Sequence, residues 1–356
     1  MNDEQPRHPD ELEREEPGLT PDPAASYTHG DLIHTAPEFA LADADVFAAE
    51  RSDVIKGTSL WRDAWRRLLK NRLAVFGMIV VVLITIASLI GPFIIKKLTG
   101  LTPDYIPTDA ALLKSIPPLT APDGSFSWLH PLGTDTQGRD MLARILQGGQ
   151  ISLMVGVIAT FVSLLIGVSW GATAGYLGGR IDNLMMRFVD VLYSLPYIVI
   201  VIVLLALFRS QTGWGQIILL FIALGSVSWL TMARIVRGQV LSLKNQEFVL
   251  AAKATGVSTP GIIFRHIVPN TLGPVIVYAT LTIPTVMLIE AFLSFLGFGV
   301  QPPLASWGSL VSDGIQNFGI FPWQLVFPGL AMALTLFSLN FLGDGLRDAL
   351  DPQTRN

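Results

Sequence analysis

Residues 151–177, ISLMVGVIATFVSLLIGVSWGATAGYL, form a run of 27 residues without a charged side chain. An α-helix rises about 1.5 Å per residue, so a helix of this length can cross the roughly 30 Å of hydrocarbon in a bilayer. We therefore predict that residues 151–177 form a membrane-spanning helix.

The same stretch carries Gly167, Gly171 and Gly175, four residues apart on one helical face. Small residues at this spacing let a second helix approach closely. The segment GVSWG also matches the G-x-S-x-G pattern of serine hydrolases, which needs a strand-to-helix turn and a histidine partner. All five histidines lie outside the predicted spans. Helix packing is therefore the favoured interpretation, and an intramembrane hydrolase acting through Ser169 is the alternative.

Five further apolar stretches each have 18 or more residues. They cover residues 73–95, 191–208, 216–233, 272–300 and 325–342. The whole chain is 51% hydrophobic and 15% charged, whereas a soluble domain normally carries about a quarter charged residues. The predicted fold class is an all-α membrane protein with six transmembrane helices, which places both termini on one side.

Two unlike segments precede the first span. Residues 1–56 hold 14 of the 28 acidic and four of the 24 basic residues, which leaves 14 acidic and 20 basic residues in the rest of the chain. This acidic segment has no apolar period, so we predict a disordered cytoplasmic tail, with a docking tail for a partner as the alternative. In residues 57–72, Trp61 and Trp65 recur at helical spacing with basic residues on other faces. That pattern predicts an amphipathic helix in contact with membrane lipid.

The distribution of basic residues predicts the orientation. Six lie within residues 56–72 and five within the loop 234–270, whereas the loop 301–324 has none. Because basic residues favour the cytoplasmic side, both termini are expected there. The loop 96–150 is then external, and its five basic residues weaken the rule little because the bias is read mainly from short loops.

Several kinds of chemistry are excluded by composition and motif. The chain has no cysteine, which removes disulfides, thiolate metal sites and cysteine nucleophiles. It has neither a G-x-x-x-x-G-K-[ST] phosphate loop nor an H-E-x-x-H zinc motif. We therefore expect no catalytic residue, no metal site, no bound cofactor and no nucleic-acid partner.

Glu290 is the only charged residue within the predicted spans. Ion-driven carriers place several ionisable or unwound ligating groups near the middle of the membrane, so one glutamate is a thin basis for ion coupling. Two interpretations stay open for Glu290: a contact between helices, or a position on the substrate path.

The stretch KNQEFVLAAKATGVSTPGIIFRHIVPN, residues 244–270, is the most informative loop. Residues 245–255 can form a short helix, and Gly256 suits the left-handed position that follows it. Ser258 is expected to cap a second short helix, which Pro269 should end near His266. Ala251 and Ala252, flanked by Phe248, leave a low surface that can seat in a groove of a partner. An ordinary well-capped loop is the alternative.

This loop resembles the "EAA" loop of binding-protein-dependent ABC importers, whose pattern is E-A-A, three residues, G, nine residues, then I-x-L-P. Ala251, Ala252, Gly256 and Pro269 match it at the expected spacing. Leu250 replaces the glutamate, and His266 and Val268 replace the isoleucine and the leucine. Whether Glu247 takes the place of the missing glutamate is open.

The resemblance narrows to the second, "C"-type permeases for oligopeptides and dipeptides. Seven blocks carry it, in order along residues 130–352. They are HPLGTDTQGRD (130–140), VDVLYSLP (189–196), WLTMARIVRGQVLSLK (229–244), VSTPGIIFRHIVPN (257–270), LSFLGFGVQPP (293–303), SWG (306–308) and GDGLRDALDP (343–352).

The resemblance implies a type I ABC importer permease in the bacterial inner membrane. Such a subunit pairs with a homologous permease, receives peptide from an external binding protein, and is driven by two cytoplasmic ATPase subunits or domains that use ATP and Mg. Relatives that carry nickel or another solute leave the substrate open, and an ion-driven carrier is a more distant alternative. In this family the ATPase-coupling residues would be Glu247, Phe248, Ala251, Ala252, Gly256, Arg265, His266 and Pro269.

Two further implications concern the external loop and the division of the chain. Asp135, Arg139 and Asp140 lie where the external loop meets the second span, and either dock the binding protein or cap a helix. The first transmembrane helix is residues 73–95, the permease core with the coupling loop 234–270 is residues 151–343, and residues 344–356 form a cytoplasmic C-terminal tail.

The charge asymmetry predicts the outcome of topology labelling. Tags inserted after Thr99 and after Pro303 should be reached by a membrane-impermeant reagent in intact cells, whereas tags near Ser258 and at Asn356 should be protected. Labelling at residue 258 from outside would reverse the orientation.

The composition of the acidic segment predicts that deletion of residues 2–50 leaves membrane insertion and transport largely intact, because a solvated chain contributes little to a packed core. Insertion and uptake should be compared in the full-length and shortened chains. Loss of complex assembly on this deletion would instead make the segment a structural element.

Overall fold

The computed structural model describes residues 60–107, 115–208, 210 and 212–351. The predicted acidic tail, and residues 352–356 of the predicted C-terminal tail, lie outside the described residues. Within them the chain is helical, with two isolated β-bridges and no longer strand. The predicted all-α membrane fold is confirmed.

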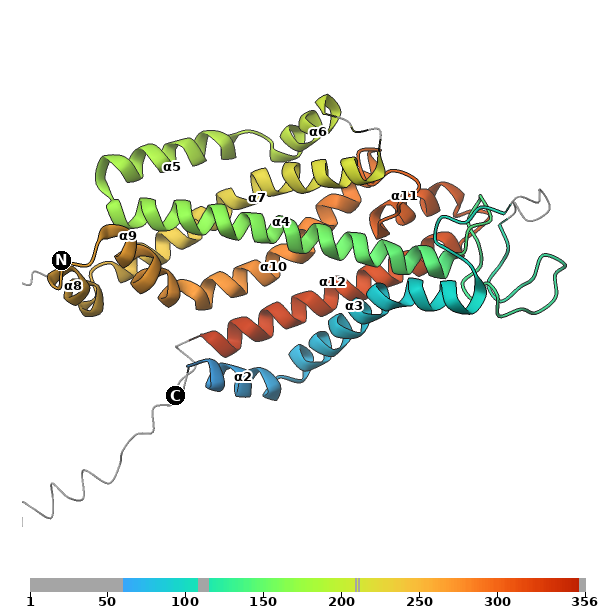
Figure 1. The fold of residues 1–356 in the computed structure, drawn as a ribbon, viewed down its shortest axis with the longest axis horizontal. Helices are drawn as coiled ribbons and strands as arrows, with labels where there is room; N and C mark the ends of the chain where they lie inside the picture. Colours follow the sequence, from blue (N-terminus) through green and yellow to red (C-terminus); the bar gives the residue numbers. More distant parts are fainter. Residues whose placement is uncertain (1–59, 108–114, 209, 211, 352–356) are drawn as a thin grey trace, which may run out of the picture. The chain divides into compact units, whose positions relative to one another are not determined.

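Five helices are long and apolar enough to cross a membrane in the part of the chain that the structure describes. They are α3 (Arg72–Thr99), α4 (Met141–Leu177), α7 (Gly213–Leu243), the continuous helix Thr259–Phe295 that contains α10 (Val268–Phe295), and α12 (Trp323–Leu350). Figure 1 shows these helices running side by side.

The third predicted span, residues 191–208, lies in a broken helix. α5 (Gly179–Ser194) and α6 (Tyr197–Leu207) are bent by 78° at the short break between them. The cause is Pro196, since the residue before a proline is pushed out of the helical region. Leu195 accordingly has φ −80° and ψ 142°. The sequence analysis predicted a span over 191–208 but not its bend, because hydropathy does not register a proline.

α4 and α7 pack directly against each other (Figure 1). The three glycines of α4 face this contact. A Cβ on Gly167 would lie 2.6 Å from the Cβ of Met232, and one on Gly175 would lie 3.0 Å from the carbonyl oxygen of Arg237. At Gly171 a Cβ would clash with the carbonyl oxygen of Ala233. The helix backbones therefore touch where the sequence places its small residues.

α2 (Leu60–Lys70) precedes the first span and is amphipathic as predicted. Ala64 and Leu68 are buried in one cluster with Ala74 of α3 and Ala349 of α12. Trp61 and Trp65 are 53% and 52% exposed. The helix is thus held to the bundle by small and aliphatic side chains and turns its tryptophans outward, where indole rings suit the membrane interface.

Two boundaries differ from the sequence prediction. α4 begins at Met141, ten residues before the predicted span, so the end of the predicted external loop is helical. The interval contains Arg144, whose charge ended the apolar pattern although its side chain is buried against Asp135. α12 likewise continues to Leu350, beyond the predicted boundary at residue 343.

The glycine contact predicts a difference between two single substitutions. Gly171→Ala inserts a methyl group against the α7 backbone and should lower stability by about 1 to 3 kcal/mol, as overpacking does. Gly238 on α7 has nothing within 4 Å of an added Cβ, so Gly238→Ala should leave stability unchanged or raise it, because alanine favours helix. Thermal unfolding of the two purified variants measures the difference. Equal melting temperatures would show that α4 and α7 tolerate separation.

Candidate functional site

The loop predicted to couple to a partner forms a compact helical hairpin between α7 and α10. α8 (Glu247–Ala254) ends before Gly256, whose φ of 79° is the predicted left-handed conformation. α9 (Thr259–Gly261) follows and continues into a π-helical turn, η1 (Ile262–Ile267), and then into α10. The hairpin is shorter than the predicted loop 234–270, because α7 extends to Leu243.

Pro269 does not end the second helix, so that prediction was wrong. In η1 the chain is wound more widely, and the Val268 N–H bonds the Ile263 carbonyl five residues back. Pro269 then occupies one of the first two positions of α10, where its missing N–H costs little. Ser258 stands at the start of α9 as predicted, but its side chain makes no capping hydrogen bond there.

The two faces of α8 have different environments. Val249 and Ala252 are buried in one cluster with Ile262, Ile263 and Val275. This packing fixes α8 to the start of α10. The prediction that Ala252 faces a groove of a partner was wrong. Its methyl group packs against the chain's own core.

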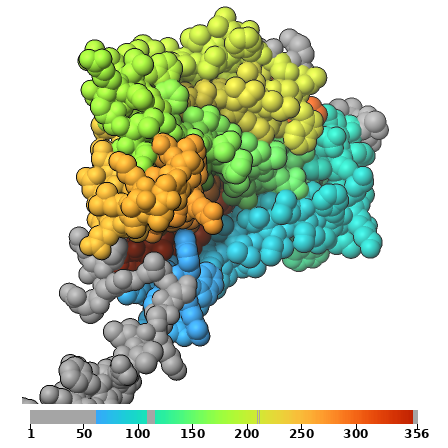
Figure 2. Space-filling model, turned by 60° about the vertical axis from the view of Figure 1, so that its left-hand side comes forward, coloured from blue at the N-terminus to red at the C-terminus, as the bar shows by residue number. Residues whose placement is uncertain are grey.

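The opposite face of α8 is open. Phe248, Leu250 and Ala251 are exposed, and so is Glu247 at the first position of the helix. Helical spacing sets Glu247 on the same face as Leu250 and Ala251. Of the remaining predicted coupling residues, Arg265 is exposed and His266 is half-buried. Figure 2 shows this hairpin in orange at the surface of the molecule.

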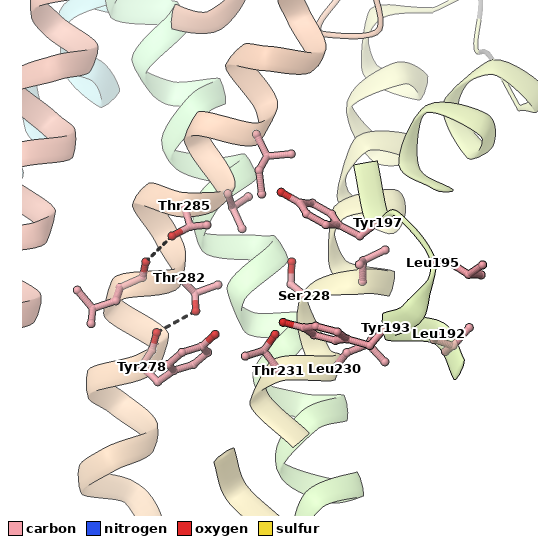
Figure 3. A pocket seen from close by; sticks show the side chains of 14 residues that line it. Leu192, Tyr193, Leu195, Tyr197, Ser228, Leu230, Thr231, Tyr278, Thr282 and Thr285 are labelled. Carbon is pink, nitrogen blue, oxygen red and sulfur yellow. Dashed lines mark hydrogen bonds between the residues drawn. The ribbon is translucent and has the colours of Figure 1, made fainter. Parts of the chain in front are cut away.

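A cavity of about 500 Å³ lies between the α5–α6 break, α7 and α10 (Figure 3). None of the described residues that line it carries a charged side chain. Seven of them bear hydroxyl groups: Tyr193, Tyr197, Ser228, Thr231, Tyr278, Thr282 and Thr285. The sequence analysis did not single these residues out, because Ser, Thr and Tyr are common in membrane helices and only the folded chain brings them together.

The hydroxyl groups differ in how they are used. Thr282 and Thr285 donate hydrogen bonds to carbonyl oxygens of their own helix, at 2.8 and 3.0 Å, and Figure 3 shows these bonds as dashed lines. Ser228 does the same toward Leu224 at 2.8 Å. In Figure 3 the rings of Tyr193 and Tyr197 extend from the α5–α6 segment toward α7 and α10. The cavity wall is thus mainly apolar, and its polar side-chain groups are uncharged hydroxyls.

Two arginines of α7, next to this cavity, bind side chains of α5. Arg234 lies 4.0 Å from the centre of the Tyr193 ring and donates to Asp190 at 2.7 Å. Arg237 binds both carboxylate oxygens of Asp182, at 2.6 and 2.7 Å. Bidentate pairs of this kind are strong and directional. The cavity wall formed by α5 is therefore tied to α7.

Glu290 is buried and makes contacts away from the cavity lining. Its carboxylate accepts hydrogen bonds from Ser294 at 2.8 Å and from Ser306 at 2.6 Å. Ser306 is the residue that caps α11 (Trp307–Asn317). Of the two interpretations left open, this geometry favours a contact between elements, here between α10 and the start of α11.

The HPLGTDTQGRD segment folds around buried ion pairs. Asp135 accepts from Arg139 at 2.7 Å and from Arg144 of α4. Asp140 caps α4 by accepting from the Ala143 N–H at 2.8 Å, and His130 Nδ1 lies 2.9 Å from its other oxygen. These residues are less than 10% exposed, so they first of all fix the start of α4. A role in docking a binding protein stays a prediction.

A third acidic group, Asp313, lies near Asp135, Arg139 and Arg144. Burial raises the pKa of the Asp313 carboxyl of α11, and the positive charges of Arg144 and Arg139 act in the opposite direction. The sequence analysis missed Arg144. Arg144 is the fourth residue of α4. An arginine at such a position in a membrane helix predicts a buried acidic partner.

The hydrolase alternative gains no support from the geometry around Ser169. Its hydroxyl donates to the Leu165 carbonyl of the same helix at 2.7 Å. It lies inside α4 and not on a strand-to-helix turn, which the nucleophile pattern requires.

Two family models match the chain. Residues 164–356 match the family described as "Binding-protein-dependent transport system inner membrane component", and residues 59–118 match the "N-terminal TM domain of oligopeptide transport permease C". Among solved structures, a chain from inward-facing conformations of the MetNI methionine ABC transporter aligns over 59% of this chain and 98% of its own length, with 17% identity and a TM-score of 0.47.

Curated relatives match over nearly their full length. The oligopeptide transport system permease protein OppC of Escherichia coli K12 is 49% identical over 301 residues, which cover 85% of this chain and 94% of the relative. The dipeptide transport system permease protein DppC of Bacillus subtilis is 45% identical, with 85% and 90% covered. The resemblance drawn from seven sequence blocks is confirmed, and the chain belongs to the family of inner-membrane permease components of binding-protein-dependent transport systems.

Proposed function

We propose that the chain is the permease subunit of an ATP-driven importer for peptides. The observation that carries the proposal is the high identity to relatives named as oligopeptide and dipeptide permeases, along nearly their whole length. A homologous permease would complete the translocation path, and an external binding protein would deliver the substrate.

The chemistry of the 500 Å³ cavity supports a peptide as the substrate. Its wall offers hydroxyl groups, aromatic rings and aliphatic side chains, which can contact peptides whose side chains differ in charge. A nickel ion would be served by imidazole or carboxylate ligands, and the described lining has neither. The cavity therefore favours peptide over metal as the solute.

The open face of α8 is the proposed contact for the ATPase. In this proposal both termini and the hairpin are cytoplasmic, and ATP and Mg are bound by the two partner ATPase subunits or domains. Exposed Leu250 and Ala251 provide a small apolar surface for a groove in such a partner, and Phe248 is exposed on the flank of α8.

Energy reaches the cavity through packing. The buried face of α8 contacts the start of α10 through Ala252 and Val249, and α8 follows α7 after a break of three residues. α7 and α10 are two walls of the cavity. A push on α8 when the ATPases close would therefore displace both walls, because packed interiors transmit strain.

Two substitutions test this coupling. Ala251→Glu places a charge on the exposed face of α8, where burial against a partner would cost desolvation free energy. Gly256→Val forces a β-branched residue into a left-handed conformation, at a local cost of about 1 to 2 kcal/mol. Both variants should insert normally, yet lose ATPase copurification or uncouple ATP hydrolysis from peptide uptake.

A matched control is Gly256→Asn, because asparagine tolerates the left-handed conformation and nothing lies within 4 Å of an added Cβ. It should retain uptake. Copurification and uptake are measured side by side in all three variants. Normal ATPase binding and normal uptake in both Ala251→Glu and Gly256→Val would show that the hairpin is an ordinary connector.

A further inference from the structure

A second concavity lies beside α5, at the end nearest the coupling hairpin. It has a volume of about 840 Å³. The residues that line it include Arg180, Leu184, Arg187, Asp190, Arg234 and Arg237. Four arginines around one open hollow are unusual in a chain with 15% charged residues.

The arginines differ in how they are neutralised. Arg234 and Arg237 are paired with Asp190 and Asp182. Among the described residues Arg180 and Arg187 make no ion pair, and both are exposed. The hollow therefore keeps an excess of positive charge, carried by two long side chains one heptad apart on α5.

An apolar stripe runs along α5 next to these two arginines. Ile181, Leu184, Phe188 and Val191 follow each other at intervals of three and four residues and are all exposed, Leu184 to 73%. This spacing places them on one helical face. Aliphatic and aromatic side chains so exposed on a membrane helix require an apolar neighbour.

The position of the hollow along the bundle suits a lipid headgroup. α5 starts at Gly179, directly after the end of α4, and the Lys244 ammonium group at the end of α7 lies 3.5 Å from the Gly175 carbonyl. Figure 1 shows the start of α5 at the same end of the bundle as α8. Arg180 thus lies near the helix ends, while Val191 lies deeper along α5.

We propose that this concavity binds an anionic phospholipid, with its phosphate-bearing headgroup between Arg180 and Arg187 and an acyl chain along the Leu184–Val191 stripe. Guanidinium groups present paired N–H donors that match phosphate oxygens. Asp182 and Asp190 hold Arg237 and Arg234 back from the ligand, so that α5 supplies the free charge. The site is independent of which solute the protein carries.

The test uses the full-length chain, extracted in detergent with its copurifying subunits. It is titrated with dioctanoyl phosphatidylglycerol or with dioctanoyl phosphatidylcholine, and the unfolding temperature reports binding. Phosphatidylglycerol should stabilise the protein at lower concentration. Arg180→Gln with Arg187→Gln should weaken phosphatidylglycerol binding by about fivefold for each arginine removed, and leave phosphatidylcholine binding unchanged.

Two further variants sharpen the result. Lys96→Gln with Lys97→Gln removes the same charge at the end of α3, outside the lining of this hollow, and should leave the preference for phosphatidylglycerol intact. Leu184→Asn should weaken binding of both lipids, because the stripe contacts the acyl chain in either case.

Three outcomes would overturn the proposal. The first is unchanged phosphatidylglycerol binding by the double arginine variant. The second is an equal, arginine-dependent stabilisation by inorganic phosphate, which would show that no acyl chain takes part. The third is arginine-dependent stabilisation by a free-acid tripeptide, but not by its C-terminal amide or by phosphatidylglycerol, which would assign the hollow to a substrate carboxylate.

Discussion

The backbones of α4 and α7 touch directly, and this contact holds the helix that provides part of the cavity wall and leads into α8. Gly167, Gly171 and Gly175 allow it, and at Gly171 even a methyl group has no room. In lipid, where burial of apolar surface gives little driving force, close packing and interhelical hydrogen bonds hold helices together. Ser163 of α4 adds such a bond by donating to the Ser228 carbonyl of α7 at 2.9 Å.

α7 provides part of the cavity wall, the arginines that bind α5 and the connection to α8. One turn of it provides Ser228 and Thr231 to the cavity wall, and the next provides Arg234 and Arg237, which bind α5. Its end leads into α8. Since α4 packs along α7, the proposed displacement of α8 would be passed along α7. The proposed coupling would run along this path within a single permease subunit.

The sequence predicts the helices well, because apolar length is a property of each segment alone. It predicts poorly where a charge or a proline interrupts that length. Arg144 marked the end of a span by its charge, yet Asp135 neutralises it and the helix continues. Pro269 marked a helix end, yet a π-turn accommodates it. Pro196 was passed over, yet it bends the third span. In each case a tertiary partner or a local change of winding decides the outcome.

The coupling hairpin shows the same limit at the level of single side chains. The alanine pair was recognised by spacing, but Ala251 and Ala252 point in different directions, and only the packing of Val249 on η1 settles which one is buried. A small residue is needed at both places for different reasons. At position 252 it lets α8 lie close to the chain's own core, and at position 251 it leaves the outer surface low. The alanine pair therefore combines an internal fit at position 252 with a low exposed surface at position 251, which is the surface proposed to contact the ATPase.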